Sequence, residues 1–288
     1  MNTFASICID GVAYGMILFM ISVGLSVTMG LMRVVNLAHG GFAMLGGALA
    51  HYGMAALGLN FAVSALLAIL VVVALSAPME RMLYRPLYRM GELQQVLATI
   101  GITFLMIATV SLWLGTSILQ IRLPASLSGA VNLGFRTLPA DRVFVIVAGI
   151  VVIGALYMLI ERTRFGVKLR AAVDERDAAA CLGIDTSRLF SRTFALGAAL
   201  AALGGIMGAG LLPIDAYYPL RYMVLFLVVV AVGGLGSIAG SFVAALGLGV
   251  LDTAARYLAP DYGTIFFYVA MIVILGWRPH GLLGRGEA

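Results

Sequence analysis

Long uncharged stretches alternate with short charged segments along the whole chain. The uncharged stretches cover 11–32, 34–79, 93–121, 143–160, 193–214, 222–251 and 262–277. They are continuous and rich in Leu, Ala, Val and Met, whereas the strands of a membrane barrel would alternate polar and apolar positions. The pattern therefore predicts membrane-spanning helices.

The lengths of these stretches indicate how many helices cross the bilayer, since one crossing needs about 20 residues. Stretch 34–79 is long enough for two crossings with a break at 53–60, and the glycine-rich 233–237 interrupts 222–251. We therefore expect an all-α, polytopic helical membrane bundle of about 8–9 transmembrane segments, one or two of them half-helices. A single domain would cover 1–288.

The composition excludes the soluble classes of protein. Of the 288 residues, 62% are hydrophobic and 11% are charged, whereas an ordinary soluble domain has roughly 45–50% apolar and about 25% charged residues. We therefore expect the lipid bilayer as a partner and no nucleic acid, despite the net charge of +5. Cys8 and Cys181 stand far apart without a CxxC pattern, so we expect neither a disulfide nor a metal site.

The basic residues predict the orientation of the helices. Segment 161–192 is a long, arginine-rich polar stretch, which places it in the cytoplasm by the positive-inside rule. Alternating crossings then put Arg33, Arg81, Arg85, Arg89, Arg278 and Arg285 inside and Arg122, Arg136, Arg142, Arg221 and Arg256 outside. A nine-segment chain has its N-terminus outside, whereas a re-entrant 40–57 moves it inside. The sequence leaves both alternatives open.

The cytoplasmic segment 161–192 contains a candidate coupling loop. Its residues 168–183 are alanine-rich and predict a short helix that ends at Gly183, a residue suited to the left-handed position after a helix. Asp185 is a natural N-cap for the next helix. The segment is either a solvated loop of mixed charge or a docking helix, in which small alanines permit close approach of a soluble partner. The docking residues would be Arg170, Asp174, Asp177, Ala178, Ala179 and Gly183.

Three polar residues are candidates for a translocation path. Asn36 and His39 lie where an apolar segment begins, before a pair of glycines. This pattern fits either a broken helix that faces a path or a hydrogen-bonded helix start. Asp252 lies inside a predicted span, where an ionisable group is costly unless it is paired or faces water. It either pairs with Arg256, four residues later, or belongs to the path.

The sequence lacks the common motifs of catalysis. It has no HExxH, GxSxG or GxxxxGK[ST] pattern, and it contains one lysine in all. We therefore expect a non-catalytic chain that has no catalytic residues and binds no cofactor. Without a P-loop the chain cannot hydrolyse ATP in that way, so any energy from ATP must come from a partner.

Short motifs across the chain resemble one transporter family. Asp177-Ala-Ala, followed by three residues and Gly183, resembles the E-A-A-x-x-x-G loop of ABC importer permeases. Asp replaces Glu here, and the later I-x-L-P element of those permeases is not recognisable. Residues 30–44, 80–87, 98–103, 194–205, 233–240 and 278–284 resemble, in the same order, the branched-chain amino acid permeases of the LivH type.

This resemblance implies the membrane-spanning permease of an ATP-driven importer in the cytoplasmic (inner) membrane of a bacterium. The implied partners are a homologous second permease subunit, two cytoplasmic ATP-binding subunits that use the ATP, and an extracytoplasmic substrate-binding protein. Transport would follow alternating access between the two permeases. The implied cargo is leucine, isoleucine and valine. Urea, short amides or other amino acids are alternatives, as is a self-sufficient channel or secondary transporter, which would normally carry more buried ionisable residues.

Overall fold

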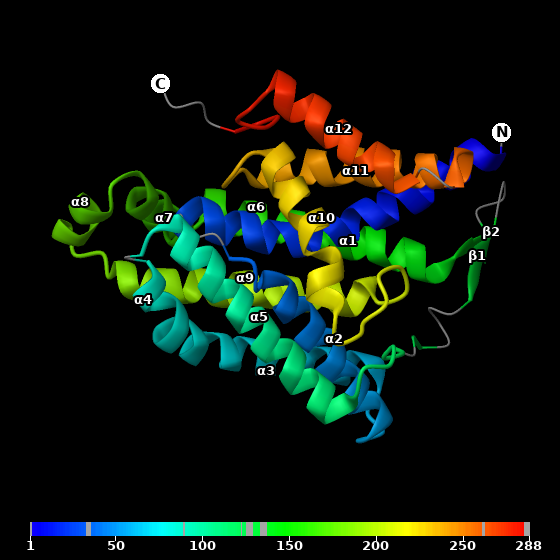
Figure 1. Ribbon diagram of the computed structural model, residues 1–288, viewed down its shortest axis with the longest axis horizontal. Coiled ribbons are helices and arrows are strands. Elements are labelled where there is room, and N and C mark those ends of the chain that lie inside the picture. Colours follow the sequence, from blue (N-terminus) through cyan, green and yellow to red (C-terminus); the bar gives the residue numbers. More distant parts are fainter. Residues whose placement is uncertain are drawn as a thin grey trace.

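The computed structural model describes residues 2–32, 36–88, 90–121, 123–124, 129–132, 137–260 and 263–284. Within them the chain is a bundle of helices with one small hairpin (Figure 1). Five arginines with a predicted side of the membrane lie outside the described residues, namely Arg33, Arg89, Arg122, Arg136 and Arg285.

Nine apolar helices make up the bundle in the described part of the chain. They are α1 (Asn2–Met32), α2 (His39–Ala55), α3 (Phe61–Met79), α5 (Glu92–Leu114), α6 (Ala140–Arg162), α9 (Thr186–Gly208), α10 (Tyr218–Gly233), α11 (Ile238–Leu258) and α12 (Gly263–Trp277). Six of them are long and apolar enough to cross a membrane. The other three, α2, α10 and α12, have 17, 16 and 15 residues. The predicted all-α membrane bundle is confirmed, and its predicted number of segments agrees with this set.

Shorter elements gather at the two ends of the bundle. They are η1 (Glu80–Tyr84), α4 (Arg85–Leu87), α7 (Arg164–Asp174), α8 (Arg176–Cys181), β1 (Ala130–Asn132) and β2 (Thr137–Pro139). The strands form an antiparallel hairpin in which Val131 pairs with Leu138. Figure 1 shows α7 and α8 at one end and the hairpin at the opposite end, beside the start of α1. We call these the α8 end and the hairpin end. The start of α1 thus lies opposite the arginine-rich loop, as in the nine-segment alternative.

Helix α1 runs through the centre of the bundle, where α9 and α11 pack closely against it. Glycines permit this approach: a Cβ at Gly249 in α11 would lie 2.6 Å from the Cα of Gly15 in α1. On the other side, a Cβ at Gly208 in α9 would lie 2.5 Å from Cγ2 of Ile17. The GxxxG spacings Gly11/Gly15 in α1 and Gly204/Gly208 in α9 therefore serve helix packing, which in a membrane depends on close backbone contact.

Helices α2 and α10 both begin inside the bundle. His39, the first residue of α2, has Nε2 3.2 Å from the carbonyl oxygen of Ile21, in the interior of α1. Near the other end of α2, Nδ1 of His51 lies 2.7 Å from the carbonyl oxygen of Gln120. The second residue of α10, Pro219, packs against Gly40 at the start of α2. Thus α2 runs from the interior to the hairpin end.

Candidate functional site

The predicted helix over 168–183 is two helices, so this expectation was wrong. Helix α7 ends at Asp174, Glu175 is extended (φ −148°, ψ 99°), and α8 follows. The break has a packing reason, because side chains from both helices are buried in one cluster against the start of α9. The cluster consists of Leu169, Ala172, Ala179, Leu189 and Phe190. Burial of apolar groups here outweighs the helix propensity of the alanine-rich segment.

The end of α8 follows the prediction. Gly183 has φ +80°, its N–H donates to the carbonyl of Ala180, and the N–H of Ile184 donates to the carbonyl of Ala179. These two bonds form a Schellman motif, which requires the left-handed conformation that glycine tolerates. The carboxylate of Asp185 then accepts from the N–H of Arg188 at 2.9 Å and caps α9, as predicted.

The candidate coupling residues divide into two groups. Asp174, Asp177 and Ala178 are exposed on α7 and α8. Ala179 is buried in the cluster under α8. Arg170 turns toward the end of α6, where its Nη1 donates to the carbonyl of Ile160 at 2.7 Å. Thus Asp174, Asp177 and Ala178 form an exposed surface, whereas Ala179 and Arg170 hold α7 and α8 in place.

A buried carboxylate joins α9 to the end of α3. Ser191 in α9 donates from Oγ to Oε2 of Glu80 at 2.6 Å, and Tyr88 donates from its hydroxyl to Oε1 at 3.1 Å. The guanidinium of Arg85 lies 3.5 Å from Oε2. Glu80 is fully buried and begins η1, a π-helical turn. Such turns are rare and are frequent at functional sites.

The same π-helical turn reaches the start of α2. Tyr84, its last residue, donates from its hydroxyl to Oδ1 of Asn36 at 3.1 Å. The same oxygen accepts from the N–H of Ala38 at 3.1 Å, directly before α2. In α5, Oγ1 of Thr99 accepts from the N–H of Leu37 at 3.3 Å. Polar contacts and one helical turn therefore lead from α9, near the α8 end, to the interior start of α2.

Glu80, Tyr84 and Ser191 are not among the candidate site residues that the sequence predicted. Glu80 seemed to mark only the end of an uncharged stretch, although it is the acidic residue that directly follows 34–79. A carboxylate next to a long apolar run is costly unless it is paired, and this was the available signal. Its partner Ser191 is 111 residues away, which no local pattern indicates.

Asn36 and His39 have the contacts of a hydrogen-bonded helix start. Both are buried, at 3% and 2% exposure, and the ring of His39 lies edge-on to Phe42 at 6.2 Å between centroids. The structure brings these two residues together at the start of α2 and does not bring Asp252 to them. A role of the two residues in a translocation path stays a prediction.

Asp252 pairs with Arg256. Oδ2 of Asp252 accepts from Nε of Arg256 at 2.7 Å. The two side chains differ in exposure, at 3% for Asp252 and 56% for Arg256. The pairing alternative therefore accounts for the buried charge of Asp252. A role of Asp252 in the path stays a prediction.

Metal ligands do not gather in the described residues: no group of three His, Cys, Asp or Glu side chains is placed to hold an ion there. Cys8 and Cys181 are free thiols in α1 and α8, with Cys8 half-buried and Cys181 exposed. The chemistry that the described sites offer is hydrogen bonding and ion pairing.

Comparisons with known proteins agree with this architecture. The family described as "Branched-chain amino acid transport system / permease component" matches residues 7–275. The permease LivH of Salmonella typhimurium, described as part of a high-affinity branched-chain amino acid transport system, is 29% identical over 96% of this chain and 94% of its own length. The permease BraD of Pseudomonas aeruginosa is 26% identical over 97% of this chain and 95% of its own length.

A probable branched-chain amino acid transport permease LivH of Methanocaldococcus jannaschii is 28% identical over 95% of this chain and 90% of its own length. No solved structure shows significant similarity to the chain. The family match covers nearly all of the helical bundle, from α1 to α12. The chain therefore belongs to the family of branched-chain amino acid transport system permease components.

Proposed function

We propose that this chain is the membrane-spanning permease subunit of an ATP-driven ABC importer that translocates leucine, isoleucine and valine. It works with a homologous second permease, two cytoplasmic ATP-binding subunits and an extracytoplasmic substrate-binding protein, in the cytoplasmic membrane. The permease is not an enzyme, and the partner subunits hydrolyse the ATP. Family membership and the relatives' described cargo support this proposal.

The observation that carries the ATP-driven mechanism is the exposed α7–α8 surface and its link into the bundle. Asp177 and Ala178 face outward on α8, where a soluble subunit has access to them. Movement of α8 displaces the start of α9, and Ser191 carries that displacement to Glu80 and the π-helical turn. The interior start of α2 follows through Tyr84 and Asn36.

Alternating access fits the way the bundle is built. The ends of α2 and α10 that meet in the interior are held by hydrogen bonds and glycine contacts, whereas the outer faces of α3, α5 and α6 are apolar and exposed. Those faces include Leu66, Leu70, Leu97, Leu105, Ile150 and Val151. They meet the bilayer or the second permease. Opening and closing of the path then takes place as the two permeases rock against each other.

Reconstitution tests the proposal. The complete complex, with its second permease, ATP-binding subunits and binding protein, is placed in proteoliposomes, and uptake of labelled leucine, isoleucine, valine, urea and acetamide is measured. We expect uptake of the three amino acids that requires ATP and stops with a hydrolysis-deficient ATP-binding subunit. Uptake of urea or acetamide without uptake of the three amino acids would overturn the proposed cargo. Uptake without ATP-binding subunits would overturn the ATP-driven mechanism.

A further inference from the structure

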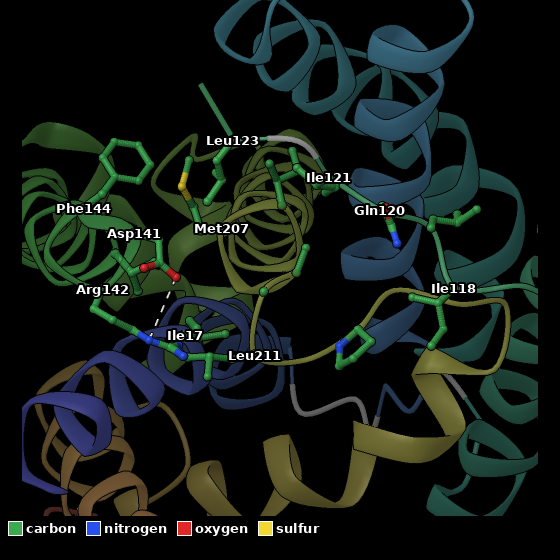
Figure 2. Close-up of a pocket in the computed structure, with 16 residues that line it drawn as sticks. Ile17, Ile118, Gln120, Ile121, Leu123, Asp141, Arg142, Phe144, Met207 and Leu211 are labelled. Carbon is green, nitrogen blue, oxygen red and sulfur yellow. Dashed lines mark ion pairs between the residues drawn. The ribbon is translucent and has the colours of Figure 1, made fainter. Parts of the chain in front are cut away.

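A pocket opens at the hairpin end between α1, α6, α9 and the segment before β1. Its volume is about 280 Å³, near the lower limit of about 300 Å³ for small-molecule sites. Figure 2 shows Asp141 and Arg142 directed toward each other beside Ile17 and Leu211, with Phe144 and Met207 on another side. A molecule the size of a single amino acid fits this volume.

Arg142 is only loosely paired in this pocket. Its Nε lies 3.6 Å from Oδ1 of Asp10 and 3.9 Å from Oδ2 of Asp141, whereas a charge-assisted hydrogen bond measures about 2.7–2.9 Å. Among the described residues, no acceptor lies within hydrogen-bond distance of this buried Nε. A buried donor without an acceptor is costly, so the site gains if a ligand supplies an oxygen.

Two other arginines in this protein form ion pairs at hydrogen-bond distance. Arg256 reaches Asp252 at 2.7 Å, and Arg221 reaches Asp215 at 2.6 Å. Arg142 has two carboxylates within 4 Å and forms a short bond with neither. Asp10 is also held by the hydroxyl of Tyr257, which donates to its Oδ2 at 3.0 Å. The pair that lacks a short hydrogen bond is therefore that of Arg142 and Asp141, the two charged residues that line the pocket.

We propose that this pocket binds a zwitterionic amino acid with an aliphatic side chain at the hairpin end of the permease. The ligand carboxylate accepts from Nε of Arg142, and its ammonium group donates to Asp141. This inference rests on the proposed function, because it names where the transported amino acid is held before it moves inward.

Charge and shape select this class of ligand. One guanidinium faces two carboxylates, so a carboxylate remains for the ammonium group once the ligand carboxylate has engaged Arg142. The remaining wall is mostly apolar and includes Ile17, Phe144, Val145, Ile206, Met207 and Leu211. Burial of a branched aliphatic side chain against it is favourable by about 25 cal/mol per Å² of apolar surface, whereas a charged side chain would lose its hydration.

Gly210 offers a steric test that removes no existing contact. It lines the pocket, and a Cβ at this position would meet Oδ2 of Asp141 at 4.0 Å. The change Gly210→Leu therefore fills the pocket from its rim. A matched control is Gly154→Leu in α6, because a Cβ at Gly154 meets nothing within 4 Å and the residue lies outside the pocket lining.

The experiment measures binding of labelled leucine to the complete complex in nanodiscs, without ATP and without the binding protein. Two leucine analogues serve as competitors. Isoamylamine lacks the carboxylate, and 4-methylpentanoate lacks the ammonium group. We expect saturable leucine binding, at least a tenfold weaker affinity for Gly210→Leu and for Arg142→Gln, unchanged affinity for Gly154→Leu, and poor competition by both analogues.

In the binding assay, the site would be overturned by no leucine binding to the wild-type complex, by equal binding to wild type and Gly210→Leu, or by full competition from isoamylamine. Phosphatidylethanolamine that co-purifies with wild type and is lost in Gly210→Leu, without any leucine binding, would assign the pocket to a lipid headgroup instead. Import of leucine by both wild type and Gly210→Leu at equal rates overturns the site and leaves the proposed function intact. Leucine binding at the pocket without ATP-dependent import would support the site and overturn the proposed function.

Discussion

The hydroxyl of Ser191 donates a 2.6 Å hydrogen bond to Oε2 of Glu80, which joins α9 to the π-helical turn after α3. Ser191 lies in the second turn of α9, close to α8, and Glu80 is fully buried. The contact therefore spans the step between a surface loop and the interior. In the proposed complex, this contact offers a route by which a subunit docked on α8 would act on helices that it does not touch.

The first prediction concerns Glu80→Gln. The amide keeps the size of the side chain but loses its charge and accepts at one oxygen, whereas the carboxylate accepts from Ser191 and Tyr88 at two. Hydrogen bonds to a charged group contribute about 1.5–3 kcal/mol each, so the link between α9 and η1 weakens by that order. We expect leucine uptake per ATP hydrolysed to fall several-fold in proteoliposomes, while basal ATP hydrolysis persists.

The control for this change is Glu92→Gln. Glu92 is an exposed glutamate in the first turn of α5, and its replacement should leave uptake unaltered. Equal uptake per ATP for Glu80→Gln and wild type would show that this hydrogen bond does not transmit movement.

The sequence indicated the bundle well because the apolar stretches are long and the bilayer allows few alternatives. It also indicated the end of α8, since Gly183 and Asp185 act through neighbouring backbone groups. The break at Glu175 was not indicated, and an interior start of α2 was only one of the alternatives that the sequence left open. Both depend on contacts between distant segments, such as Ala179 with Leu189 and Gly40 with Pro219. Asp141 and Arg142 form a pocket edge only because α1 and α9 pack beside them.

The second prediction concerns Gly183→Val. The backbone of Gly183 has φ +80°, and a Cβ there would meet nothing within 4 Å, so the cost comes from the backbone alone. A β-branched residue disfavours this region, and the left-handed conformation costs an L-residue about 1–2 kcal/mol. We expect the Schellman motif to open, with loss of leucine uptake and of stimulated ATP hydrolysis. Membrane abundance should be unchanged.

Gly183→Asn provides the comparison, because asparagine tolerates the left-handed conformation better than valine does. It should retain most of the uptake. If Gly183→Val transports as well as wild type, the geometry of α8 has no part in coupling.

The third prediction uses the two native cysteines to test orientation. Cys181 is exposed on α8, whereas Cys8 is half-buried near the start of α1, at the hairpin end. An impermeant maleimide added to intact cells should leave Cys181 unlabelled and should label it in inside-out vesicles. Labelling is read by mass shift, with Cys8→Ser and Cys181→Ser to assign the signal. Labelling of Cys181 from outside would reverse the predicted orientation.

The last prediction concerns the pair of Asp252 and Arg256, whose two members are unequally buried. Removing Arg256 leaves a carboxylate with 3% exposure without its guanidinium, whereas removing Asp252 leaves an arginine with 56% exposure that water can solvate. A buried charge that loses its partner costs about 3–5 kcal/mol. We therefore expect Arg256→Gln to lower the melting temperature of the purified complex more than Asp252→Asn does.

The double variant separates the pairing role of Asp252 from a path role. If Asp252 only balances Arg256, then Asp252→Asn with Arg256→Gln removes both charges, and stability and leucine uptake should return close to the level of Asp252→Asn alone. Uptake is compared at matched membrane abundance across wild type, both single variants and the double variant. A double variant that melts like wild type but does not transport would show that Asp252 acts in the path, because its charge would then be needed after the pairing cost has been removed.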